Sequence, residues 1–187
     1  IKSKKKITFN YIYYDINGAI KMRKNGYKYI VSPYYLINNF GKYYLIASNN
    51  NYNNHVIYRL DYLANIEIIN QAIKPIEEIE SLGNNFNINK YINEHIYLFG
   101  GDVITAKILI KPNKERNGIT YIYDWFGSNA RIITKDNKSY AIIKTDEDAL
   151  FYWLLQYIEF FEIIEPLSLK NKIIKTLTET LEVYKKS

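Results

Sequence analysis

A chain of 187 residues with 48% hydrophobic residues is long enough for one large domain or for two small domains with separate cores. It has no cysteine and only two histidines, which excludes disulfides, thiolate metal sites and thiol nucleophiles and argues against a histidine-based metal centre. The net charge of +6 favours an anionic partner such as nucleic acid. However, the chain is rich in Ile, Asn, Lys and Tyr together, which is expected of an A/T-rich genome. The positions of the charged residues are therefore more informative than their number.

The first part of the chain predicts a series of short antiparallel strands. From Ile7 to Ile69 apolar and polar residues alternate, and turn residues interrupt the pattern at "DINGA", "NNFGK" and "NNNYNN". Two of these connections contain Gly close to Asn or Asp, which suits the positive backbone angles of hairpin turns. About five strands in so short a segment predict a small barrel or a strongly bent sheet.

The pattern changes after Pro75, where helical spacing replaces alternation. The stretch "NINKYINEHIYLF" has apolar residues three and four apart, as on an amphipathic helix. We therefore expect a strand-rich domain over residues 1–75, a helical linker over 76–100 and a second domain over 101–187.

The second domain predicts alternating strands and helices. A strand at "VITAKILIK" precedes a helix from Pro112 to about "YDWFGSN", and "ARIITK" and "SYAIIKT" form a hairpin. Asp146 can cap the helix "EDALFYWLLQYI", the strand "FFEIIEP" stops at Pro166, and a final helix follows. Strand, helix, strand, strand, helix, strand is the ferredoxin-like order, so the predicted class is α+β.

The sequence gives no sign of membrane insertion or export. It has no apolar run of about eighteen residues, and the basic start "IKSKKKITFN" is not followed by the apolar segment of a signal peptide. We therefore expect a soluble cytoplasmic protein without a membrane partner.

Several ordered motifs resemble the WYL domain and its C-terminal extension. In the first part these are "YIVSPYYLI", "GKYYLIAS" and "YRLDYL", with Tyr43, Tyr44 and Leu45 in the place of Trp-Tyr-Leu. In the second part "YIYDWFGSNARI" and "FYWLLQYIEFFEIIEPLSLKNKI" are similar to the extension. The resemblance covers nearly the whole chain.

The resemblance implies a small Sm-like, SH3-type β-barrel followed by a ferredoxin-like extension with a C-terminal helix. Similar proteins are mostly bacterial transcriptional regulators, in which the barrel binds single-stranded nucleic acid or a nucleotide-like ligand and the extension supports a homodimer. They usually bind DNA through an N-terminal winged helix-turn-helix. No helical segment precedes Ile7 here, and the start at Ile1 favours an excised effector domain.

Two strand residues are candidates because the resemblance places charge at their positions. It implies a ligand-facing arginine at Arg59, although a guanidinium there can instead pair with a carboxylate such as Asp61. The second arginine of the pattern is Tyr62 in this chain, so stacking is expected to replace part of the lost charge.

Further candidates are aromatic or hydroxyl side chains on the predicted strands. Tyr44 is the central residue of the triplet, and core packing is the alternative to ligand contact. Tyr35 offers a ring for base stacking, and Ser32 either donates to a phosphate or caps a bend before Pro33. Tyr13 lies on the same strand face as Phe9 but nearer the strand end, so we expect it at a pocket rim.

Two more arginines complete the candidate set. Arg23 precedes the "KNG" turn and can supply a basic lip or simply face solvent. Arg131 opens a strand and is a candidate for contact with a ligand or a second subunit.

No residue pattern supports enzyme chemistry or a cofactor. The carboxylate clusters "PIEEIE" and "TDEDA" lie at expected helix starts, and "FGGDV" lacks the lysine and spacing of a phosphate-binding loop. Two functions remain: an effector-sensing module that binds nucleic acid or a nucleotide, and a structural dimerisation module whose ligand site has decayed.

Overall fold

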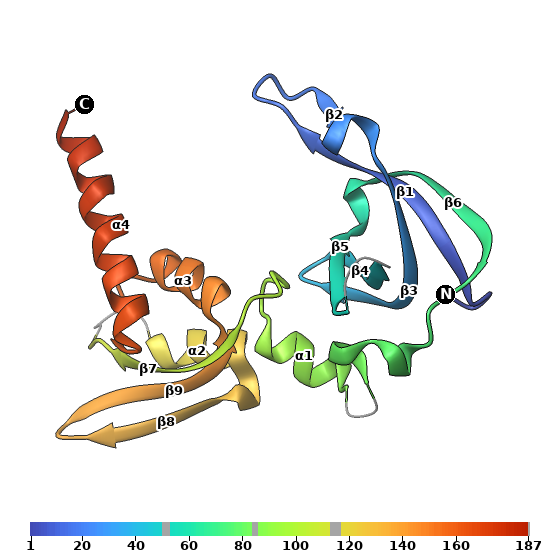
Figure 1. The fold of residues 1–187 in the computed structure, drawn as a ribbon. Helices are drawn as coiled ribbons and strands as arrows, with labels where there is room; N and C mark the ends of the chain where they lie inside the picture. Colours follow the sequence, from blue (N-terminus) through green and yellow to red (C-terminus); the bar gives the residue numbers. More distant parts are fainter. Residues whose placement is uncertain (50–52, 84–85, 113–116, 187) are drawn as a thin grey trace. The chain divides into compact units, whose positions relative to one another are not determined.

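The chain folds as two compact units, Ile1–Asn87 and Ile88–Ser187, in the computed structural model. The structure describes residues 1–49, 53–83, 86–112 and 117–186 (Figure 1). The predicted linker, residues 76–100, spans the boundary between the units. Its first part forms 3-10 turns of the first unit, Ile76–Glu78 (η3) and Glu80–Leu82 (η4), and its second part contains α1 (Ile88–Glu94). Within the described residues, no helix is long and apolar enough to cross a membrane.

The first unit is a six-stranded sheet in which every pairing is antiparallel. The strand order is β2-β1-β3-β4-β5. The sixth strand, β6, also pairs with β1 and lies off this path. The strands are β1 (Lys5–Tyr14), β2 (Ile20–Met22), β3 (Lys28–Asn39), β4 (Lys42–Asn49), β5 (His55–Arg59) and β6 (Leu63–Ala72).

Of the two predicted forms, a small barrel or a strongly bent sheet, a closed barrel is not formed among the described residues. The stretch "HVIYRLDYLANIEII", expected as one strand, is divided by a 3-10 turn, Leu60–Tyr62 (η2), into β5 and β6. After this turn β6 pairs with β1, and among the described residues no pairing joins β6 to β5. The sheet is therefore open between these two strands.

The predicted hairpins at "DINGA" and "NNFGK" are confirmed. Asp15 Oδ1 accepts hydrogen bonds from the Asn17 and Ala19 N–H groups, and β1 and β2 pair on either side of this turn. Phe40 and Gly41 have φ values of 47° and 74°, which close the β3–β4 turn. The third predicted turn, "NNNYNN", lies partly outside the described residues.

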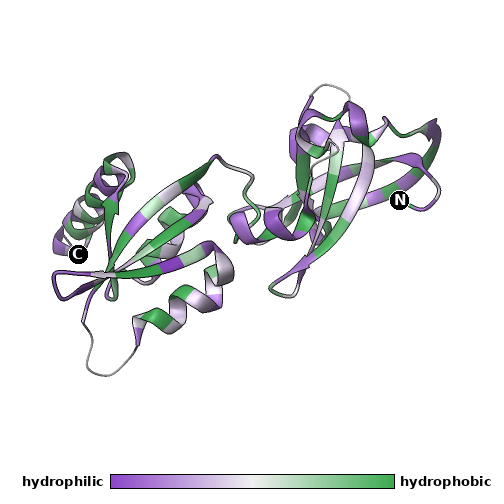
Figure 2. Cartoon of the chain, turned by 90° about the horizontal axis from the view of Figure 1, so that it is seen from below, coloured by the Kyte–Doolittle hydropathy of each residue, from purple (hydrophilic) through white to green (hydrophobic). Residues whose placement is uncertain are grey.

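One core cluster of the first unit lies on one face of the sheet and is rich in aromatic residues. Alternation places Phe9, Val31, Leu45, Ala47 and Tyr58 on this face, and all five are buried. Figure 2 shows hydrophobic and hydrophilic residues following one another along the strands.

The second unit contains a four-stranded antiparallel sheet and the four α-helices of the described chain. Its sheet order is β10-β7-β9-β8. The predicted α+β class and the predicted order of elements are both present. The elements after α1 are β7 (Val103–Ile110), α2 (Gly118–Phe126), β8 (Ala130–Lys135), β9 (Lys138–Asp146), α3 (Glu147–Gln156), β10 (Phe161–Glu165) and α4 (Leu167–Lys186).

Local signals set the helix ends in the second unit. Asp146 caps α3 as predicted, because its Oδ1 accepts a hydrogen bond from the Ala149 N–H at 2.8 Å. The helix expected from Pro112 begins at Gly118, where the Asn117 side chain accepts from the Ile119 N–H; residues 113–116 lie outside the described residues. The core of this unit includes Trp153, which is fully buried.

Candidate functional site

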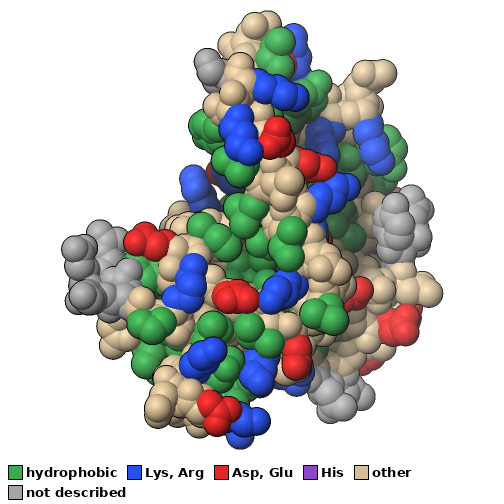
Figure 3. All heavy atoms as spheres, turned by 90° about the vertical axis from the view of Figure 1, so that its left-hand side faces the viewer, with side chains coloured by type: hydrophobic (Ala, Val, Ile, Leu, Met, Phe, Trp, Pro, Cys, Tyr) green, Lys and Arg blue, Asp and Glu red, His purple; other side chains and the backbone are tan. Residues whose placement is uncertain are grey.

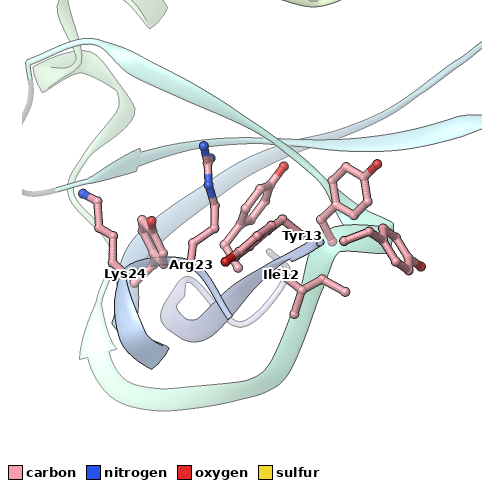
Figure 4. Close-up of a pocket in the computed structure, with 8 residues that line it drawn as sticks. Ile12, Tyr13, Arg23 and Lys24 are labelled. Carbon is pink, nitrogen blue, oxygen red and sulfur yellow. The ribbon is translucent and has the colours of Figure 1, made fainter. Parts of the chain in front are cut away.

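A tyrosine-lined cavity lies in the first unit at the end of β1. Its volume is about 930 Å³, which is within the range of pockets that bind small organic ligands. Five tyrosines and two basic residues account for most of its wall, and none of the described lining residues is acidic. The lining consists of Tyr11, Ile12, Tyr13, Tyr14, Arg23, Lys24, Tyr29 and Tyr62 (Figure 4).

Alternation along β1 carries the aromatic core outward into this cavity. Phe9 is fully buried, Tyr11 is half-buried, and Tyr13, two residues further, is 46% exposed. Tyr13, expected from the sequence to lie at a pocket rim, lines this cavity. Burial is the main cause that raises the pKa of Tyr11, so its phenol is protonated at neutral pH and can donate a hydrogen bond.

Ring contacts hold the tyrosines of the cavity in place. The centroids of the Tyr11 and Tyr62 rings are 5.9 Å apart, and those of Tyr14 and Tyr62 are 6.4 Å apart, both in edge-to-face geometry. The Tyr29 ring stacks on Phe9 at 5.5 Å. Because these rings support one another, their faces are ordered before any ligand arrives.

The 3-10 turn Arg23–Gly26 (η1) supplies the positive charge. Lys24 and Asn25 have left-handed backbone angles, with φ values of 47° and 51°. Such angles are unfavourable for residues other than glycine and persist only where neighbouring groups hold them. Figure 4 shows the Arg23 and Lys24 side chains extending from this turn to the same side.

A buried amide holds this turn in position. Asn10 on β1 is 4% exposed, and its Nδ2 donates to Gly26 O at 2.7 Å and to Tyr27 O at 3.2 Å. Asn65 on β6 donates in turn to Asn10 Oδ1 at 2.9 Å. The amide therefore ties the turn to two strands.

The two basic residues of the turn have aromatic rather than acidic neighbours. Arg23 Cζ lies 5.7 Å from the centre of the Tyr11 ring, and Lys24 Nζ lies 5.8 Å from the centre of the Tyr27 ring. Within the described part of the chain neither forms an ion pair with a carboxylate. Their charge is therefore available to an anion in the cavity.

The Arg59 side chain forms an ion pair with Asp61 and does not face the cavity as a free charge. Its Nε and Nη2 each donate to one carboxylate oxygen of Asp61 at 2.8 Å, and its Cζ lies 4.2 Å from the centre of the Tyr62 ring. This bidentate hydrogen bonding raises the pKa of Arg59 and holds the pKa of Asp61 below its usual value. Arg59 thus lies behind a cavity ring without contributing a free charge.

Tyr44 faces Arg59 across the β4–β5 pairing. It is half-buried, and burial is the main cause that raises its pKa, whereas Tyr43 is exposed. Neither tyrosine of the triplet lines the described cavity wall, and Leu45 enters the core.

The remaining predicted site residues lie elsewhere. Ser32 is fully buried, and its Oγ accepts a hydrogen bond from the Lys74 N–H at 2.9 Å, which is a structural contact. The Tyr35 ring packs on Phe86 at 5.6 Å, and Arg131 is exposed on β8 of the second unit.

Of the predicted residues, the structure brings Tyr13, Tyr62 and Arg23 together in one cavity. Lys24, Tyr11, Tyr14 and Tyr29 also line the cavity but were absent from the predicted set. The available signals were the basic pair before Asn-Gly and the alternation of tyrosines along β1.

Comparison with known proteins gives a family match within the first unit. Residues 1–68 match the family model of the WYL domain. No curated protein matches the sequence.

Two solved structures are similar to this chain at low identity. One is described as proteasome accessory factor B/C (PafBC) of Arthrobacter aurescens, with 17% identity and a TM-score of 0.37, covering 92% of this chain and 24% of that one. The other is described as a CRISPR Cas-related protein, with 12% identity and a TM-score of 0.52, covering 96% of this chain and 48% of that one. The chain thus spans 24% and 48% of the lengths of these two structures, and the second shares its fold. The WYL domain match, over residues 1–68, lies within the first unit.

Proposed function

We propose that the first unit is the ligand-sensing module of a regulatory protein and binds single-stranded nucleic acid or a nucleotide-like anion in the tyrosine-lined cavity. This proposal rests on one observation: five tyrosine rings line the same cavity as Arg23 and Lys24, whose charges are not paired with a carboxylate among the described residues. A base and its phosphate need these two kinds of group. Stacking on an aromatic ring is worth about 1–3 kcal/mol per base in single-strand binders.

The charge of the chain is concentrated in the unit that holds the cavity. Residues 1–87 contain eleven Lys and Arg against six Asp and Glu, a net charge of +5, and residues 88–187 contain fourteen against thirteen, a net charge of +1. A basic unit raises the local concentration of anionic ligands.

The WYL domain supports a regulatory rather than an enzymatic role. We propose that ligand binding to the first unit biases a DNA-binding helix-turn-helix domain outside these residues. The sheet order β10-β7-β9-β8 supports the interpretation of the second unit as a ferredoxin-like WYL extension.

The first test measures the binding of a labelled single-stranded tetranucleotide by fluorescence anisotropy at low salt. We expect binding by the wild type and at least tenfold weaker binding by the double variant Arg23→Ala/Lys24→Ala, because both free charges of the cavity are removed. Arg131→Ala is the matched control, since it removes an exposed arginine from the second unit. The proposal fails if the wild type does not bind or if the double variant binds like the wild type.

A second candidate function, dimerisation, is favoured by an exposed stripe on α4. Ile174, Leu177, Leu181 and Tyr184 recur at spacings of three, four and three residues and are 41% to 76% exposed. Leu169 and Ile173, in the first two turns of the helix, pack into the core of the unit. Figure 3 views the molecule from the side on which α4 lies in Figure 1, where hydrophobic and charged side chains are mixed on the surface.

We propose a second copy of α4 as the occupant of this stripe. The spacing is that of coiled-coil core positions, and the flanking residues Thr178 and Thr180 place no like charges against one another. Light scattering is expected to give twice the chain mass of 22.2 kDa for the wild type, and the single-chain mass for Leu177→Lys/Leu181→Lys. Glu179→Lys, on the other side of the helix, is the control, and a monomeric wild type would exclude this function.

A further inference from the structure

A second cavity adjoins the tyrosine-lined one. Its volume is about 550 Å³, and it shares Tyr11, Arg23, Lys24 and Tyr29 with the first. The two basic residues of the η1 turn therefore belong to the walls of both cavities. Each cavity also has its own residues, which differ in chemistry.

The second cavity adds amide groups to the aromatic wall. Asn53 and Asn54, in the connection from β4 to β5, are both exposed, and Tyr27 is 46% exposed. An Asn side chain offers one acceptor and two donors, and it can pair with two atoms of an adenine edge at once. The residues that line only the first cavity include three aromatic rings instead, those of Tyr13, Tyr14 and Tyr62.

The two cations therefore belong to the shared part of the wall, with Tyr11 and Tyr29, while other rings line only the first cavity and Asn53, Asn54 and Tyr27 line only the second. A dinucleotide has a matching arrangement of a base, a phosphodiester and a second base. A mononucleotide would fill one cavity only, because its single base leaves the other without a partner. Arg59, whose guanidinium is already paired with Asp61, is not needed for the phosphate contact.

We propose that the two cavities are two nucleoside subsites of one groove, so that the ligand is an oligonucleotide of at least two nucleotides. The linking phosphate lies at Arg23 and Lys24, and Asn53 and Asn54 recognise the base in the second subsite. This inference rests on the proposed function of the first cavity and narrows its ligand class.

The test is calorimetric comparison of deoxyadenosine monophosphate with the dinucleotide dA2 at low salt. Because dA2 carries less charge than the monophosphate, tighter binding of dA2 reports the second base rather than electrostatics. We expect the wild type to bind dA2 at least tenfold more tightly than the monophosphate, and more tightly than dT2.

The variant Asn53→Ala/Asn54→Ala isolates the second subsite. We expect it to lose the dinucleotide advantage while its affinity for the monophosphate stays within about twofold, since the first cavity is intact. Asn38→Ala/Asn70→Ala, which changes two other residues of the same unit at the β3 end and on β6, is the matched control and should bind like the wild type.

The outcomes separate the two proposals. Equal affinity for the monophosphate and dA2, or equal weakening of both by Asn53→Ala/Asn54→Ala, overturns the two-subsite inference and leaves the proposed function standing. Binding of neither nucleotide, together with no binding of the tetranucleotide, overturns both.

Discussion

Arg59 illustrates how one neighbouring residue decides the role of a charge. The Asp61 carboxylate accepts hydrogen bonds from Arg59 Nε and Arg59 Nη2. The ion pair therefore presents almost no net charge to a ligand on the far side of the Tyr62 ring. Lys42 Nζ also lies 3.8 Å from Asp61 Oδ2. In contrast, Arg23 reaches its cavity beside Tyr11 with its charge intact. The two arginines of this unit are thus not equivalent for anion binding.

Removing the Asp61 charge should release Arg59. We expect Asp61→Asn to bind the labelled tetranucleotide about three- to tenfold more tightly than the wild type, since one charge-assisted contact is worth roughly 1 kcal/mol at a partly exposed site. Glu67→Gln is the control, because it removes one negative charge from the same unit outside the cavities, at a residue that pairs with Lys28. Equal affinity gains in both variants would show that net charge, not Arg59, causes the effect.

At the scale of the element, the η1 turn depends on a residue that does not touch the cavity. Asn10 makes two hydrogen bonds to backbone carbonyls of and beside the turn and accepts one from Asn65. Without these hydrogen bonds the backbone of the turn, with its left-handed Lys24 and Asn25, would lose its buried polar contact with β1.

We expect Asn10→Ala to lower the free energy of unfolding of the first unit by about 1–3 kcal/mol, because it leaves buried polar partners unsatisfied. Oligonucleotide affinity should fall as well, since the turn no longer holds Arg23 and Lys24 in place. Urea denaturation followed by circular dichroism measures the first effect, and anisotropy measures the second. Asn65→Ala, which removes one hydrogen bond only, should have the smaller effect on both. A destabilised Asn10→Ala that binds normally would contradict the positioning role.

The elements that could be predicted from sequence are those with local signals. Alternation predicted the β1 face that carries Phe9 and Tyr13, and a capping carboxylate predicted the start of α3 at Asp146. The break at Leu60–Tyr62 has no periodic signature, so β5 and β6 were expected as one strand.

Contacts between distant residues account for what the sequence could not predict about the site. The Ser32 hydroxyl has its partner at Lys74, 42 residues away, and Asn10 has one at Asn65, 55 residues away. Arg23 was a candidate by its position before a turn, but the fold alone places it beside Tyr11 and Tyr62.

At the scale of the whole molecule, charge separates the two units. The first has a net charge of +5 and contains both cavities, whereas the second has +1 and carries the exposed stripe of α4. This division agrees with the two proposals, which place ligand binding in the first unit and self-association in the second. Salt should therefore weaken the first function strongly, whereas the apolar stripe on α4 should be insensitive to it.

The salt dependence of oligonucleotide binding measures how many phosphates of the ligand the protein neutralises. For single strands the slope of log K against log salt concentration is about −0.7 for each phosphate neutralised. With one linking phosphate held by both Arg23 and Lys24, we expect a slope of about −0.7 for the wild type and a slope near zero for Arg23→Ala/Lys24→Ala. Arg131→Ala should keep the wild-type slope. If Arg23→Ala/Lys24→Ala also keeps it, the η1 turn does not hold the phosphate, because a contact that releases counterions cannot be removed without changing the slope.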